Sequence, residues 1–155
     1  MTPDIDSLLP ISTTLEVRDR CLCLHAQRAA RAVARAFDDA FRPHKITSGQ
    51  FSILMSLNRP DPPRISDLVP LLGMDRTTLT AALKPLAARG LVDIAQDPQD
   101  RRNRRLSLTD AGRSVLKAAL PDWRRTQAAL EARLDRLAPD DLRGALDEIA
   151  ARPAP

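Results

Sequence analysis

Residues 64–109 read RISDLVPLLGMDRTTLTAALKPLAARGLVDIAQDPQDRRNRRLSLT, and this stretch decides the expected fold. A short helix is predicted over residues 66–72 and a second over residues 76–89, each ended by a glycine. Two short β-type runs follow, over 91–94 and 106–108, on either side of an arginine-rich turn. Helix, turn, helix and hairpin in this order are the layout of a winged helix-turn-helix, a fold that reads duplex DNA.

Basic side chains are concentrated in the same stretch. The whole chain has 24 Lys+Arg and 20 Asp+Glu. Residues 76–105 hold seven basic and three acidic side chains, and the remaining residues carry 17 of each sign. Nearly all of the basic residues are arginine, whose planar guanidinium suits phosphates and guanine edges. A general preference for arginine explains their overall number, but their clustering predicts a surface that faces phosphates.

Length and composition limit the other possibilities. A chain of 155 residues is long enough for a sizeable core, and no apolar run approaches the roughly 20 residues of a membrane span. The N-terminal stretch is acidic and broken by proline, which does not fit a secretory signal. Cys21 and Cys23 lie two apart in a helical pattern, so their side chains diverge and a disulfide between them is not expected. The cytoplasm is the expected location.

Helical regions are expected on both sides of the DNA-reading lobe, which spans residues 46–109 in a single structural domain. Residues 1–15 are predicted to be a flexible arm. Residues 16–45 and 110–151 carry apolar side chains every three or four positions, the pattern of helices, although Pro121 should kink or split one of them. These stripes are too broad for one small lobe, so they predict a homodimer whose helices pack across a two-fold axis. The expected fold class is mainly α with a small β-hairpin wing (α+β).

Two pairs of motifs resemble the MarR family of bacterial transcription regulators. The first pair is LGMDRTTLT at 72–80 with LAARGLV at 86–92, and the second is DPQDRR at 97–102 with LSLTDAG at 106–112. The resemblance extends over about residues 16–151. It implies a homodimer that binds a palindromic operator, usually as a repressor. It also implies release by a small molecule or, in a subset of the family, by cysteine oxidation.

The second helix and the wing should supply the DNA contacts. Helical spacing directs Leu79, Leu83 and Leu86 inward. The outward-facing residues are Arg76, Thr77, Thr80, Ala81 and Lys84. The wing should contribute Arg101, Arg102 and Arg104. Asp100 and Arg102 are expected to pair across the hairpin bend and brace the wing, as the resemblance to the MarR family also implies. The alternative for both elements is an ordinary solvated surface.

Two other groups of residues allow more than one interpretation. Cys21 and His25 lie four apart on a predicted helix, where an imidazolium would favour the thiolate and make Cys21 a redox sensor. Simple packing of the cysteine is the alternative. Phe41, His44 and Trp123 are candidates to line a pocket for a small effector, with core packing as the alternative. A metal site is not expected, because the few Cys and His residues lack ligand spacing.

The sequence offers no recognisable catalytic or cofactor motif, so neither an enzyme nor a bound cofactor is expected. The expected function is a dimeric, cytoplasmic transcription regulator with duplex DNA and a small organic effector as partners. One alternative is a thiol-based redox sensor of the same fold that uses Cys21. Another is a protein-interaction module that has lost DNA binding, but Arg76, Lys84 and the wing arginines argue against it.

Overall fold

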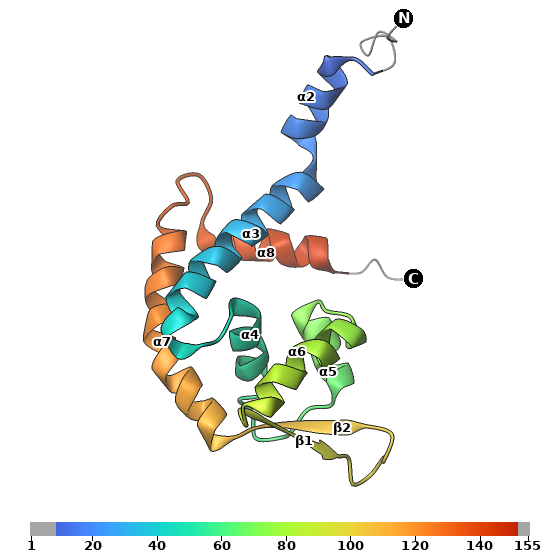
Figure 1. Cartoon of the computed structure of the whole chain (residues 1–155). Helices are drawn as coiled ribbons and strands as arrows, with labels where there is room; N and C mark the ends of the chain where they lie inside the picture. The colour runs from blue at the N-terminus through green and yellow to red at the C-terminus, as the bar shows by residue number, and fades with distance from the viewer. Residues whose placement is uncertain (1–8, 152–155) are drawn as a thin grey trace, which may run out of the picture. The chain divides into compact units, whose positions relative to one another are not determined.

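The computed structural model describes residues 9–151 and is mainly helical with one antiparallel hairpin, which confirms the predicted fold class (Figure 1). The elements in chain order are α2 (Ile11–Arg20), α3 (Leu22–Phe41), η1 (Arg42–His44), α4 (Ser48–Ser56), α5 (Ile65–Leu72), α6 (Arg76–Ala88), β1 (Val92–Gln96), β2 (Arg104–Leu108), α7 (Asp110–Glu131) and α8 (Pro139–Ala150). The chain divides into two compact units, residues 1–36 and 37–155. Across residues 9–151, no helix has the length and apolar character needed to cross a membrane.

In the first unit, α2 occupies residues that the sequence suggested would belong to an arm. The predicted arm is wrong over residues 11–15, because α2 starts at Ile11, and its residues 1–8 lie outside the described residues. Pro10, with φ of −58°, precedes the first turn, and an ion pair between Glu16 and Arg20 supports the exposed helix. Cys21 has an extended backbone, so the apolar pattern that continues across it belongs to two helices, α2 and α3.

Local capping signals determine where the helices of the second unit begin. The Thr47 hydroxyl accepts from the Gln50 backbone N–H, and the Gln50 side chain accepts from the Thr47 N–H, a capping box that starts α4. Before α6, a carboxylate oxygen of Asp75 accepts from the Thr78 N–H at 2.8 Å. Both caps satisfy N–H groups that a helix start leaves without partners. The bounds of α5 and α6 agree with the predicted helices to within one residue.

A Schellman motif ends α6 and directs the chain into the wing. Gly90 has a φ of 67°, a left-handed conformation that glycine adopts without steric cost. Its N–H donates to the Ala87 carbonyl, and the Leu91 N–H donates to the Leu86 carbonyl. The glycine predicted to stop this helix therefore does so by satisfying the last carbonyl groups.

The wing is the hairpin of β1 and β2. Val92 lies opposite Leu108 and Gln96 opposite Arg104, so both strands extend further toward the turn than the predicted runs. The chain just before α5 lies along the other edge of β2, where the Leu106 N–H donates to the Pro63 carbonyl at 2.9 Å. The hairpin is thus held to the start of the helix-turn-helix by backbone pairing.

The core of the second unit contains side chains from α4, α5, α6, both strands and α7. Leu79, Leu83 and Leu86 are fully buried, as their spacing predicted. The burial of each side chain contributes on the order of 1.5–3 kcal/mol to the stability of the fold. Their burial leaves the opposite face of α6 to solvent. After the wing, α7 runs from Asp110 to Glu131 and continues through Pro121, so the helix is not split there.

The start of α7 packs tightly against the start of the wing. The Thr109 hydroxyl accepts from the Gly112 N–H at 3.0 Å and donates to the Gly90 carbonyl at 2.7 Å. A Cβ on Gly112 would lie 2.3 Å from the Leu91 carbonyl oxygen, so only glycine permits this close approach. The N-cap residue Thr109 therefore also joins α7 to the chain entering the wing.

Candidate nucleic-acid interface

The exposed face of α6 carries the five residues expected to face outward. All five are exposed, and together they line a shallow surface depression of about 330 Å³. The lining residues are Arg76, Thr77, Thr80, Ala81 and Lys84. The structure therefore brings together every candidate contact residue of this helix.

Hydrogen bonding leaves the polar groups of this face available. The Thr80 hydroxyl donates to the Arg76 carbonyl at 2.7 Å, so its oxygen still accepts from a partner. Neither Arg76 nor Lys84 forms an ion pair with any other residue between 9 and 151. Hydrogen bonds from Thr78, its backbone N–H first, lower the pKa of Asp75 and keep the cap ionised.

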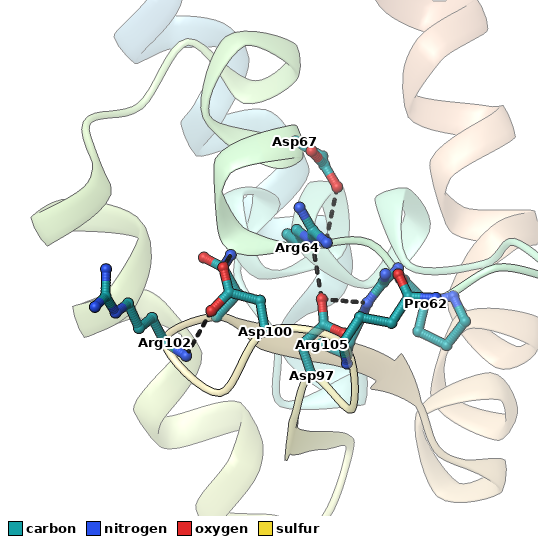
Figure 2. A network of polar contacts seen from close by, with 9 residues as sticks. Pro62, Arg64, Asp67, Asp97, Asp100, Arg102 and Arg105 are labelled. Atoms are coloured by element: carbon teal, nitrogen blue, oxygen red, sulfur yellow. Dashed lines mark hydrogen bonds and ion pairs between the residues drawn. The ribbon is translucent and has the colours of Figure 1, made fainter.

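The wing tip exposes three arginines, Arg101, Arg102 and Arg104. The predicted side-chain pair between Asp100 and Arg102 is wrong. One Asp100 carboxylate oxygen instead accepts from the backbone N–H of Arg102 at 3.0 Å, and the Arg102 side chain points away from it (Figure 2). The other oxygen accepts from the Asn103 amide at 2.9 Å. In a tight turn the backbone N–H two residues on is closer to a carboxylate than the end of a long side chain, so Asp100 shapes the turn and leaves the guanidinium free.

The sequence interpretation missed a buried carboxylate at the turn end of the hairpin, directly after β1. Asp97 is 0% exposed, and its Oδ2 accepts from Nε of Arg64 at 2.9 Å and from Nε of Arg105 at 3.1 Å (Figure 2). Its Oδ1 accepts from the Gln99 N–H at 3.0 Å. The Gln99 N–H, followed by Arg64 and Arg105, lowers the pKa of Asp97 despite its burial. The available signal was hairpin register, which places Asp97 beside Asn103 at the end of the ladder.

The backbone N–H of His25 donates to the Cys21 carbonyl at 3.1 Å, but the described residues show no hydrogen bond between the two side chains. The predicted geometry is wrong because Cys21 precedes α3 instead of lying within a continuous helix. Its Sγ accepts from the Leu24 N–H at 3.4 Å, and over residues 9–151 no hydrogen bond joins the thiol to the imidazole. Cys23 is exposed and contacts Gln27. Across that same range, no group of three His, Cys, Asp or Glu side chains is arranged to hold a metal ion.

Of the three aromatic candidates for a ligand pocket, Trp123 lines a cavity in the described part of the chain. The cavity measures about 260 Å³ and lies between α4 and α7. Its lining residues are Phe51, Ser52, Met55, Leu120 and Trp123. The prediction that Phe41 lines the pocket is wrong, because its ring is buried against Phe51, with centroids 4.6 Å apart. His44 is also misassigned, since its Nε2 lies 2.6 Å from a carboxylate oxygen of Asp122. That contact with His44 is the main reason the pKa of Asp122 is lowered.

Comparisons with known proteins agree with this architecture. Residues 46–103 match the MarR family. The regulator TtmR of Methylorubrum extorquens is 34% identical over 97 residues, which are 63% of this chain, and the chain spans about half the length of that relative. The transcriptional regulator MosR of M. tuberculosis, solved in complex with DNA, superposes with a TM-score of 0.77 and 34% identity, covering 84% of this chain and 94% of MosR.

The transcriptional repressor CouR, solved bound to a 23-mer DNA duplex, gives a TM-score of 0.77 and 31% identity. That match covers 87% of this chain and 96% of CouR. The family match includes α4, α5, α6, β1 and the turn that follows it, and the structural matches extend to the long helices. The chain therefore belongs to the MarR family of winged helix-turn-helix, DNA-binding transcriptional regulators, which are not enzymes.

Proposed function

We propose that this protein is a repressor that binds a two-fold symmetric operator as a homodimer and is released by a small organic effector. The observation that carries the proposal is the exposed face of α6, where the five candidate residues line one depression and both cations lack an ion-pair partner among the described residues. MosR and CouR, whose structures contain DNA, support it by similarity.

On the operator, the first half of α6 enters the major groove. Arg76 donates two hydrogen bonds to a guanine edge, and Thr77 and Thr80 contact phosphates or thymine methyl groups. Lys84 reaches a phosphate. The wing-tip arginines extend into the adjacent minor groove, where the negative potential is strongest. The helix supplies base readout and the wing mainly supplies affinity.

A second copy covers the apolar side chains that one chain leaves exposed on its long helices. Leu22 is 74% exposed on α3, and Ile149 is 69% exposed on α8. Exposed apolar side chains repeated along helices are typical of an interface. A two-fold dimer would place two α6 helices on half-sites about 34 Å apart, one turn of DNA.

The cavity between α4 and α7 is the effector site of this proposal. The Phe51 and Trp123 rings are nearly parallel there, with a 14° interplanar angle and centroids 6.5 Å apart. The Ser52 hydroxyl already donates to the Ser48 carbonyl, and no charged side chain of the described residues is among the lining residues. Such a lining favours a flat, uncharged, apolar effector. The effector releases DNA only by binding the DNA-incompetent arrangement more tightly.

Selection from a random duplex library, followed by titration of the selected operator, tests the proposal. Arg76→Ala should weaken operator binding by the equivalent of about 1–3 kcal/mol while retaining binding to unrelated duplex. Arg136→Ala, which removes an exposed arginine between α7 and α8, is the matched control and should leave binding unchanged. Equal operator affinity for Arg76→Ala and Arg136→Ala would refute the assignment of α6.

The effector part has its own measurement. Trp123 is the single tryptophan of the chain, so its fluorescence reports occupancy of the cavity directly. Titration with neutral 1-naphthol should change this fluorescence and release the operator, whereas the 1-naphthoate anion should do neither at the same concentration. Operator release without a change at Trp123 would place the effector elsewhere.

A further inference from the structure

We propose that Asp97 is a positioning residue for DNA binding. Its buried carboxylate clamps the wing to the start of the helix-turn-helix, keeps Arg64 and Arg105 away from DNA, and fixes where the wing-tip arginines are presented. The inference rests on the proposed function, in which the wing contacts the operator. We call the carboxylate and its two guanidinium partners the wing clamp.

The wing clamp joins three segments of the chain at one side chain. Arg64 stands at the N-cap of α5, Arg105 lies in β2, and Asp97 follows β1 (Figure 2). Both guanidinium Nε atoms bind the same carboxylate oxygen, and the Gln99 N–H binds the other. Arg105 also donates to the Pro62 carbonyl at 2.9 Å. Among the described residues no buried side-chain N or O atom lacks a hydrogen-bond partner, which is the condition under which a buried charge is stabilising.

The outer half of the hairpin depends on this clamp. Along β1 only Val92 is buried, and the four residues from Asp93 to Gln96 are exposed. On β2 the buried side chains are Leu106 and Leu108, both nearer to the lobe than the tip is. The core therefore holds only the base of the wing. Beyond it, Asp97 provides the contacts that fix the direction of the turn bearing the tip arginines.

The negative charge of Asp97 supports a role for this residue in DNA binding as well as in folding. A carboxylate in a DNA-contacting wing reduces the attraction of that wing for phosphates. Two arginines are also occupied by it, and their side chains are only 35% and 32% exposed. Without the carboxylate, the two guanidinium groups would repel each other and separate β2 from the residues before α5. The wing clamp therefore fixes the position of the wing and at the same time weakens the electrostatic attraction between the wing and DNA phosphates.

The first test compares two isosteric substitutions in one hairpin. Asp97→Asn removes the clamp charge, and Asp93→Asn removes an exposed charge from β1, the strand that precedes Asp97. Asp93→Asn should bind the operator as well as or better than the wild type, because one repulsive charge is gone. Asp97→Asn should bind about tenfold more weakly and show a smaller salt slope, since each lost phosphate contact lowers the slope by about 0.9. Equal affinities for the two variants would overturn the proposal.

A double-mutant cycle separates positioning from global stability. Replacing Arg101 and Arg104 by alanine should weaken wild-type binding but have little further effect in the Asp97→Asn background. Arg76→Ala should have its full effect in both backgrounds, because α6 does not depend on the clamp. If Asp97 had only a structural role, the wing-arginine substitutions and Arg76→Ala would each cost as much binding energy in the Asp97→Asn background as in the wild type. Such additivity between Asp97→Asn and the wing-arginine substitutions would refute the proposal that the clamp positions the wing.

A charge-conserving variant keeps the test valid if Asp97→Asn unfolds. Arg105→Lys retains the positive charge but lacks the Nε that binds the carboxylate. It should reproduce the weakened binding and reduced salt slope, and wild-type behaviour would overturn the proposal. If the wild type bound no duplex DNA, the proposed function would fail instead. Amide exchange at Gln99, which should quicken in Asp97→Asn, would still report on the clamp itself.

Discussion

Gly112→Ala should destabilise the protein even though alanine favours helices. Gly112 lies in the first turn of α7, where an added Cβ would be 2.3 Å from the Leu91 carbonyl oxygen and 2.7 Å from a Leu108 methyl. The methyl could rotate away, but the carbonyl is part of the backbone. It accepts from the Thr109 N–H at 3.2 Å, so moving it would break the junction between wing and helix.

The expected magnitude follows from opposing effects. Helix propensity favours alanine over glycine by up to about 1 kcal/mol. Overpacking of a tight contact costs about 1–3 kcal/mol, and losing the backbone hydrogen bond costs about 0.5–1.5 kcal/mol more. Repulsion from the backbone outweighs the propensity gain, and a net loss of about 1–3 kcal/mol in the free energy of unfolding is expected.

Gly144→Ala provides the matched control, because Gly144 is a helical glycine of α8 with nothing within 4 Å of an added Cβ. There the substitution should stabilise by about 0.5–1 kcal/mol. Urea unfolding followed by far-UV circular dichroism would measure both, at one protomer concentration because the stability of a dimer depends on it. A Gly112→Ala variant as stable as the wild type would refute the close-packing argument.

Four further outcomes are expected. Operator affinity should fall steeply with salt, with a log–log slope of several units because each phosphate contact contributes about 0.9, and a flat dependence between low and moderate salt would contradict phosphate contact by the arginines. Equilibrium sedimentation at micromolar concentration should give a dimer, and a monomer there would contradict the interface proposed for the long helices. Mild peroxide should leave operator binding intact in both wild type and Cys21→Ser, whereas release confined to the wild type would identify a thiol sensor. Folding lowers the pKa of Asp97, so its ionised carboxylate should stabilise the wing fully above about pH 3.9, the ordinary pKa of aspartate. This stabilisation should be lost as the pH falls through the lowered pKa of the folded protein. Amide exchange rates of the hairpin, measured against pH in the wild type and in Asp97→Asn, would check this.

Features governed by neighbouring residues could be predicted from the sequence. The cap at Asp75 and the glycine stop at Gly90 depend on residues within one turn, and the predicted bounds of α6 were correct to within one residue. The face of α6 followed from helical period and the burial of its leucines. These are the positions where local geometry and core packing agree.

Features governed by distant contacts could not be predicted in the same way. The ion pair between Arg64 and Asp97 spans 33 residues, and nothing near Asp97 marks its carboxylate as buried. Phe41 was misassigned because its environment depends on Phe51, which lies in the next helix. The interruption at Cys21 has no glycine or proline beside it, and the apolar pattern continues across it.

The Thr109 hydroxyl has a consequence for how this protein could diversify. It binds the Gly90 carbonyl, 19 residues earlier, so the entry and exit of the wing meet at one side chain. Residues 91–108 between them therefore form a loop whose two ends are held together by this hydrogen bond, whatever the length of the loop. Because doubling a loop costs only about 0.6 kcal/mol of closure entropy, an insertion between Gln99 and Arg102 would mainly cost the hydrogen bonds with which Asp100 shapes the turn. New operator preferences could therefore arise at the wing tip by changes in length as well as by substitution, without repacking either flanking helix.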